Sequence, residues 1–105
     1  MDEYAWPTGP EVPAADLVRK SWETTVAALP IGARVTGEVI GRQPFGVFIR
    51  IDGVPHAVAL AEITAMPQGM DLPALGTFVS GAVYWHTAHN HQVKVRLDEW
   101  QAADE

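Results

Sequence analysis

The sequence contains no cysteine, which excludes disulfide bonds and any metal site that depends on a cysteine ligand. It also lacks an apolar run long enough to cross a membrane. The acidic start, Met1-Asp2-Glu3-Tyr4, has neither the basic nor the apolar stretch of a signal peptide. We therefore expect a soluble, cytoplasmic protein whose 105 residues form one small domain.

Catalytic motifs are absent as well. No serine or lysine lies in a recognisable nucleophile motif, there is no phosphate-binding loop, and no two acidic residues have the spacing of an acid–base pair. We interpret Glu38, Asp52 and Glu62 as surface charges. Because catalysis needs a site and the sequence shows none, we predict that the protein is not an enzyme and uses no cofactor.

Basic residues are scarce, since seven lysines and arginines stand against 13 acidic residues and give a formal net charge of -6. The excess acid lies in the two ends of the chain, residues 1–30 and 98–105, whereas residues 31–97 are nearly balanced. The ends therefore disfavour a polyanionic partner, while the middle of the chain does not.

The amino-terminal part contains chain breakers and then one helical pattern. Prolines and a glycine in residues 1–13 predict an extended lead-in. In residues 14–29, between Pro13 and Pro30, apolar side chains recur at helical spacing, at Val18, Trp22, Val26 and Leu29. This pattern predicts one amphipathic helix.

Beyond the helix the apolar period changes to two, which is typical of strands. The alternation predicts five strands at about residues 33–43, 46–52, 57–61, 77–86 and 92–97. Residues 62–75 are expected to form a turn of helix and a loop. Five bent antiparallel strands predict a mainly β fold, a small closed barrel over residues 30–98, followed by an acidic tail at 99–105.

The outward face of the second predicted strand carries an aromatic residue. The apolar residues on either side of Phe48 point inward, so Phe48 shares the outer face with Arg50. An aromatic ring beside an arginine suits single-stranded nucleic acid, because bases stack and each linkage carries a phosphate. The alternative is that the amphipathic helix, with its Trp22 stripe, covers Phe48.

Glycines and apolar residues follow a fixed order along residues 30–98. The order runs through Gly32 with Val35, Gly37 and Val39, then Pro44-Phe45-Gly46-Val47-Phe48-Ile49, Gly53 with Val58 to Ile63, Leu75-Gly76, and Val93-Lys94-Val95-Arg96-Leu97. It resembles the RNA-binding domain repeated in the ribosomal S-one protein. The resemblance implies a five-stranded antiparallel Greek-key barrel of the oligonucleotide-binding (OB) fold, and single-stranded RNA as its ligand.

The resemblance also implies a set of binding positions. Members of that family bind RNA through two aromatics around the glycine of strand two, a histidine on strand three, an acidic residue at the end of strand four and an arginine at the start of strand five. The aromatic positions fall on Phe45 and Phe48. The other three hold Ala59, Thr87 and Gln92, which depart from the pattern.

Five basic residues, Arg34, Arg42, Arg50, Lys94 and Arg96, lie on the outward phase of their strands, where phosphate contacts are expected. Strands two and five can flank one groove in this topology, so Arg50, Lys94 and Arg96 are the stronger candidates. The predicted nucleic-acid-binding residues are therefore Phe45, Phe48, Arg50, Lys94 and Arg96. The same basic residues would also suit any solvated strand.

Three histidines, His86, His89 and His91, lie close together at a predicted hairpin tip. Such spacing raises the question of a zinc site, but structural zinc needs four ligands and no acidic or cysteine partner is near in the sequence. We predict a solvated turn and no metal.

Two functions follow from these patterns. The first is weak, non-specific binding of single-stranded RNA by a stand-alone OB barrel, through stacking and phosphate contacts. The alternative is a protein-interaction module that keeps the barrel, has lost the RNA site, and binds a partner through the Trp22 helix or the acidic termini. Membrane association is not expected.

Overall fold

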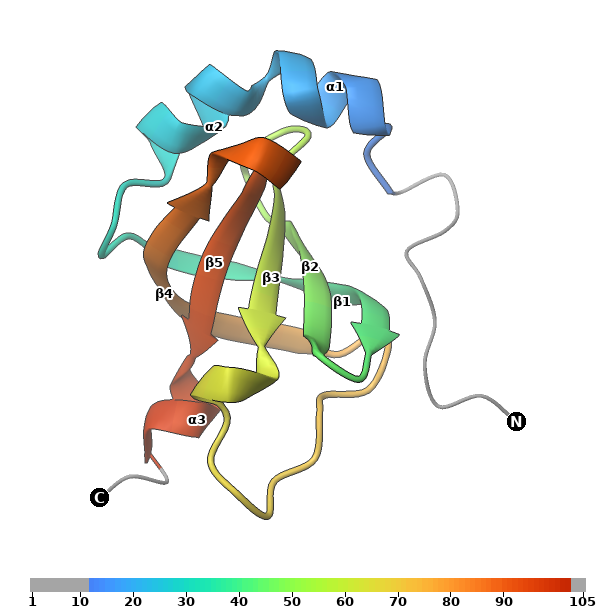
Figure 1. Cartoon of the computed structure of the whole chain (residues 1–105), viewed down its shortest axis with the longest axis vertical. Helices are drawn as coiled ribbons and strands as arrows, with labels where there is room; N and C mark the ends of the chain where they lie inside the picture. Colours follow the sequence, from blue (N-terminus) through green and yellow to red (C-terminus); the bar gives the residue numbers. More distant parts are fainter. Residues whose placement is uncertain (1–11, 103–105) are drawn as a thin grey trace.

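Five strands close into a barrel in the computed structural model, which describes residues 12–102 (Figure 1). The strands are β1 (Arg34–Gln43), β2 (Gly46–Ile51), β3 (Val58–Glu62), β4 (Phe78–Thr87) and β5 (Gln92–Leu97). Their order around the barrel is β1-β2-β3-β5-β4. A 3-10 helix, η1 (Ile63–Ala65), and a loop join β3 to β4, and a second, η2 (Ala88–Asn90), joins β4 to β5. The predicted mainly β barrel is confirmed.

One strand pairing differs from the predicted antiparallel barrel. The strands β3 and β5 pair in parallel, whereas the other four neighbouring pairs are antiparallel. The reason is geometric, because a closed ring with an odd number of strands cannot reverse direction at every step. At least one neighbouring pair must therefore run the same way.

The barrel interior is filled by alternate side chains of its strands. Val47, Ile49 and Ile51 of β2 belong to the buried core cluster, together with Val93, Val95 and Leu97 of β5. The chain then continues as α3 (Asp98–Ala102), at the end of the barrel where η1 also lies and away from the amino-terminal helices (Figure 1). Trp100 of α3 is 1% exposed and joins the same cluster. Most of the segment predicted as an acidic tail thus forms a helix that is anchored in the core, and residues 103–105 lie outside the described residues.

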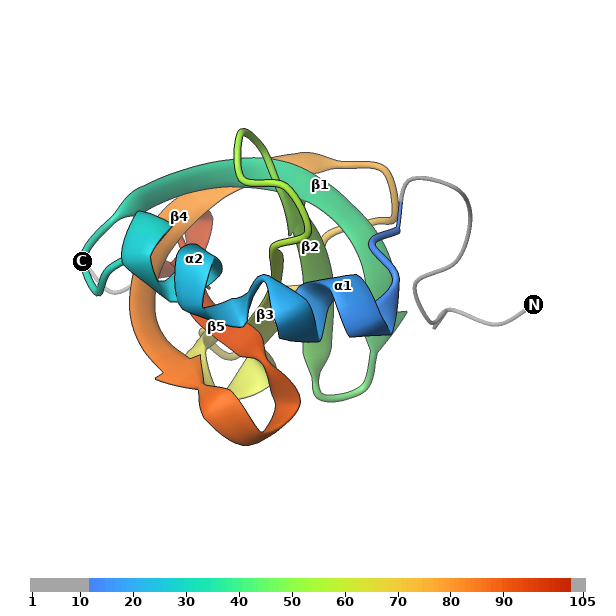
Figure 2. The ribbon, with the colours of Figure 1, turned by 90° about the horizontal axis from the view of Figure 1, so that it is seen from above.

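The predicted amino-terminal helix is divided in two. Helix α1 (Ala15–Lys20) and helix α2 (Trp22–Ala28) meet at Ser21, whose backbone leaves helical geometry at φ -91° and ψ 2°. Seen from above, both helices cross the end of the barrel where the β2–β3 loop and η2 lie (Figure 2). Most of the predicted lead-in falls outside the described residues. Of the helices that are described, none is long and apolar enough to cross a membrane.

Candidate nucleic-acid interface

A row of side chains crosses the outer face of the barrel from β2 to β4. Strand register aligns Phe48 of β2 with Leu60 of β3, Leu60 with Lys94 of β5, and Lys94 with Trp85 of β4. None of these four residues belongs to the interior core cluster. Neighbouring strands lie about 4.8 Å apart, and this outer row follows the curved wall of the closed barrel over three such spacings. It joins two of the predicted binding residues, Phe48 and Lys94.

The β2 end of the outer row is covered. Phe48 is 6% exposed and Leu60 is 4% exposed, although neither points into the barrel. Val18 of α1 and Phe48 both line a groove of about 420 Å³. A second groove, of about 630 Å³, is lined by Leu17 of α1 and by Arg50. Helix α1 therefore borders the groove at Phe48, which favours the alternative to stacking that the sequence analysis considered.

Phe45 lies at the rim of the same surface and remains accessible. Its side chain is 42% exposed, and its ring meets that of Phe48 edge to face, with centroids 6.0 Å apart. The following residue, Gly46, has φ +151°, and a Cβ there would lie 2.2 Å from the carbonyl oxygen of Ala61. Only glycine lets β2 begin this close to β3. The turn therefore holds Phe45 beside Phe48.

Two of the three predicted basic residues are held in ion pairs. Arg50 donates a hydrogen bond from Nη2 to Oε1 of Glu38 at 2.8 Å. Lys94 Nζ lies 2.8 Å from Oε2 of Glu62, and the Lys94 side chain is only 12% exposed. Arg96 is exposed and forms no ion pair within residues 12–102. The structure therefore brings Lys94 and Arg96 together on β5 and holds Arg50 apart on β2.

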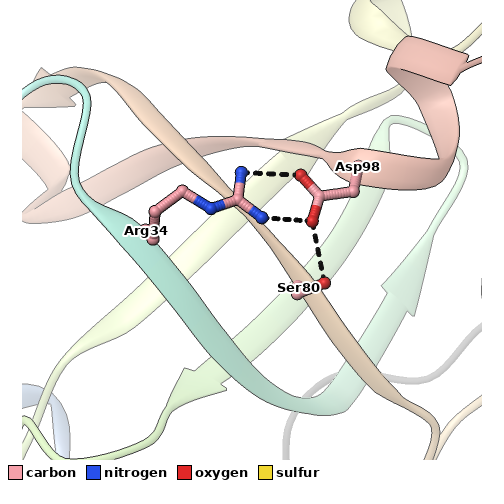
Figure 3. Close-up of polar contacts among 3 residues, drawn as sticks. All are labelled: Arg34, Ser80 and Asp98. Atoms are coloured by element: carbon pink, nitrogen blue, oxygen red, sulfur yellow. Dashed lines mark hydrogen bonds and ion pairs between the residues drawn. The ribbon is translucent and has the colours of Figure 1, made fainter.

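The remaining outward arginines tie parts of the fold together. Arg34 binds Asp98 through two hydrogen bonds, one of 2.8 Å from Nη1 to Oδ1, and Ser80 Oγ donates to Asp98 Oδ2 at 2.9 Å (Figure 3). The hydrogen bonds from Arg34 are the main cause that lowers the pKa of Asp98, and the bond from Ser80 adds to it. Arg42 Nε donates to the carbonyl oxygen of Pro73 at 3.0 Å. These contacts fasten α3 and the β3–β4 loop to the barrel.

Two exposed aromatics at the β4 end of the outer row were missed by the sequence analysis. The register of β4 shifts between Val83 and Trp85, so Tyr84 and Trp85 are exposed in succession, at 39% and 59%. The Tyr84 hydroxyl donates to Oε1 of Glu62 at 3.3 Å. Burial first, and then the charge of Glu62, raise the pKa of Tyr84. A bulge hides this surface from any argument based on alternation, and two adjacent aromatics were its only signal.

The three positions that depart from the S-one pattern lie in different surroundings. Ala59 has no exposed surface and belongs to the core, so it contributes nothing to the outer face. Thr87 and Gln92 face each other at the loop end of the β4–β5 hairpin, on either side of η2. Gln92 also lines the groove beneath α1, where its buried Oε1 accepts no hydrogen bond from the residues that the structure describes.

Two of the three histidines of the β4–β5 hairpin, His86 and His91, pack against α2, whereas His89 is exposed. His86 Nε2 lies 2.6 Å from the carbonyl oxygen of Leu29, which can only accept, so this nitrogen donates. The Trp22 ring meets His86 and His91 edge to face, with centroids 6.3 and 5.7 Å apart. Across the described part of the chain, no group of three or more histidine, cysteine or acidic residues is arranged to hold a metal ion.

Comparison with known proteins gives matches among solved structures only. The sequence matches no protein-family model and no curated protein. RNase R of Mycoplasma genitalium is 17% identical with a TM-score of 0.62, and the match covers 74% of this chain and 15% of that one. The values are the same for its complex with ribose methylated single-stranded RNA.

Two further structures match over most of the barrel. GSP13 from Bacillus subtilis is 24% identical with a TM-score of 0.58, over 73% of this chain and 62% of that one. A chain of the a/eIF2alpha-aDim2p-rRNA complex from Pyrococcus horikoshii is 17% identical with a TM-score of 0.56, over 70% and 49%. This chain therefore spans less than two thirds of each of these proteins. The likenesses confirm the OB barrel that the S-one resemblance implied.

Proposed function

We propose that this S-one-like OB barrel binds single-stranded RNA on the outer face of β2, β3 and β5, as a binding domain without catalytic activity. The observation that carries the proposal is the likeness in fold to RNase R, which has been solved with a single-stranded RNA bound. Only 15% of the RNase R chain takes part in that match, so its enzymatic activity is not carried over.

Phe45 is the residue we assign to the first stacked base. Its ring is accessible at the rim of the barrel, and the edge-to-face contact with Phe48 limits how it can turn. Phe48 itself becomes available to a base only when α1 moves aside. The free-energy cost of that motion is small, because α1 is six residues long and none of its residues is buried.

Arg50, Lys94 and Arg96 are the residues we assign to phosphates. Arg96 is exposed, whereas Arg50 and Lys94 have to exchange a carboxylate for a phosphate oxygen. Such an exchange gains little free energy in water, because the ion pair that is lost resembles the one that forms. Binding is therefore expected to be weak and to depend on several small contributions.

The test is a titration of the full chain with a short mixed-sequence RNA, followed by fluorescence anisotropy. Phe45→Ala should raise Kd at least about fivefold, the loss of one stacked base. Phe78→Ala is the matched control, since this aromatic is 68% exposed on β4 and lies outside the outer row. If three basic groups engage, log Kobs should fall with log salt at a slope of about -2. A flat salt response would contradict the proposal.

The protein-interaction alternative has less support from the described residues. Trp22, which was to be its anchor, is half-buried and packs on His86 and His91. Of the amino-terminal acidic segment, Asp2, Glu3 and Glu11 lie outside the described residues. The carboxyl-terminal segment is partly occupied, because Asp98 is paired with Arg34 and Trp100 is in the core.

A further inference from the structure

The β4 end of the outer row presents aromatic surface to solvent. Trp85 is 59% exposed, and among the large apolar side chains that the structure describes only Phe78 is more so. The bulge sets Tyr84 next to it, with 39% of its surface exposed. Two adjacent exposed rings on one strand are unusual for a surface without a ligand, because each leaves apolar area in water.

Positive charge lies beside these rings. Lys94 is in register with Trp85, and Arg96 follows two residues later on the same outer face of β5. Arg96 is close enough to Tyr84 for its charge to counteract the rise in pKa of the phenol. Among the described residues, Glu62 is the carboxylate that contacts this group, through Tyr84 and Lys94, in a chain whose formal net charge is -6.

We propose that Tyr84 and Trp85 form a second stacking site for single-stranded nucleic acid, with Arg96 and Lys94 contacting the adjacent phosphates. The inference rests on the proposed function and extends it to a second site. A strand whose first base stacks on Phe45 runs past Phe48, follows the outer row over Leu60 and Lys94 and reaches Trp85, so it curves around the wall of the closed barrel. The bound strand therefore crosses β2, β3, β5 and β4 in turn.

The chemistry of this surface favours nucleic acid over a protein. An apolar partner would bury Arg96 without a counter-charge, which is costly. A second copy of this chain, joined through a two-fold axis, would set Arg96 and Lys94 against the same charges of its partner. A nucleotide offers a flat base to each ring and a phosphate to each cation, so it satisfies both features at once.

The experiment uses the full chain, an RNA long enough to cross the barrel, and two variants of one residue. Trp85→Ala should raise Kd at least about fivefold. Trp85→Phe keeps a ring and should hold Kd within about twofold. Stacking on Trp85 should quench the tryptophan fluorescence of the parent chain, and Trp85→Phe should lose that quenching while it still binds. Phe78→Ala, on the same strand, should change neither signal.

The outcomes separate this inference from the proposed function. If the parent chain binds no RNA, both are wrong. If it binds, and Phe45→Ala weakens binding while Trp85→Ala and Tyr84→Ala do not, only the second site is wrong. Sedimentation that shows a dimer abolished by Trp85→Ala would make this surface a contact between copies and would overturn the inference. Should Trp85→Ala fail to fold, the loss of quenching in Trp85→Phe decides the question.

Discussion

The two ends of the outer row carry aromatic residues in opposite surroundings. At the β2 end Phe48 points outward but is 6% exposed, in a groove that α1 borders. At the β4 end Trp85 also points outward and is 59% exposed. Phe48 is in register with Leu60 and Trp85 with Lys94, so strand pairing alone does not explain why one ring is buried and the other exposed. The comparison shows that a residue's position in the alternation along a strand sets which face its side chain lies on. Contacts with segments distant in sequence set whether that side chain is accessible to a ligand.

The cover over the β2 end is itself weakly held. Helix α1 has six residues, none of them buried, and its N-cap Ala14 makes no side-chain hydrogen bond to the helix. A helix this short has little stability of its own and depends on packing. By contrast, α3 at the other end of the barrel is anchored by Trp100 in the core. The covered aromatic therefore lies beneath the least secured helix.

The largest expected difference between the β2 end and the β4 end of the outer row is in the free energy of unfolding. Phe48→Ala should lower the free energy of unfolding by about 3 kcal/mol, since it removes a buried ring. Trp85→Ala should change it by no more than about 0.5 kcal/mol, because most of that ring is already in water. Chemical denaturation of both variants beside the parent chain measures the difference. Equal losses would mean that the two rings are equally buried in solution, and the comparison would fail.

The barrel could be predicted from the sequence because its signals are local. Alternating apolar residues and the glycines between them placed all five strands to within about two residues, as this pattern commonly allows. The parallel pairing of β3 with β5 was not predicted, since it follows from closure of the ring and not from any one strand. The break at Ser21 was missed for a related reason, because the apolar stripe continues through it.

Less of the candidate site than of the barrel could be predicted from the sequence. Outward direction was deduced correctly for Phe48 and Lys94, yet burial beneath α1 and pairing with Glu62 are tertiary facts. Tyr84 and Trp85 were missed because a bulge breaks the period of two that the argument used. Which of these residues contact RNA stays a prediction.

A smaller effect should follow when the carboxylates beside the basic residues are neutralised. Glu62→Gln removes the ion-pair partner of Lys94, which lies near the exposed β4 end of the outer row. Glu38→Gln removes the ion-pair partner of Arg50, which lines a groove beside α1. Both substitutions change the net charge by the same amount. Glu62→Gln should tighten RNA binding about threefold, because the phosphate no longer competes with Glu62 for Lys94, and Glu38→Gln should do less.

The salt dependence of binding provides the control for this pair of variants. If Lys94 gains a phosphate in Glu62→Gln, the log–log salt slope should steepen by about 0.7, the single-strand coefficient for one contact. A general change in field would tighten both variants equally and leave the slopes alike. That result would mean that the β2 end and the β4 end of the outer row do not differ in how their basic residues meet RNA.

The smallest effect concerns an ion pair outside the outer row, which serves as a reference for the two ends. Arg34 lowers the pKa of Asp98 below its ordinary value of 3.8, so the ionised carboxylate stabilises the fold above that pH and the contribution is lost as the pH falls through the lowered pKa. Asp98→Asn should lower Tm by about 2 °C at pH 7, as expected for an exposed pair. The gap to the parent chain should close as the pH falls through that lowered pKa and Asp98 becomes protonated. Because the pair lies away from the outer row, RNA affinity should stay unchanged, and a loss of affinity would show that the binding surface extends to the seam between β1 and β4.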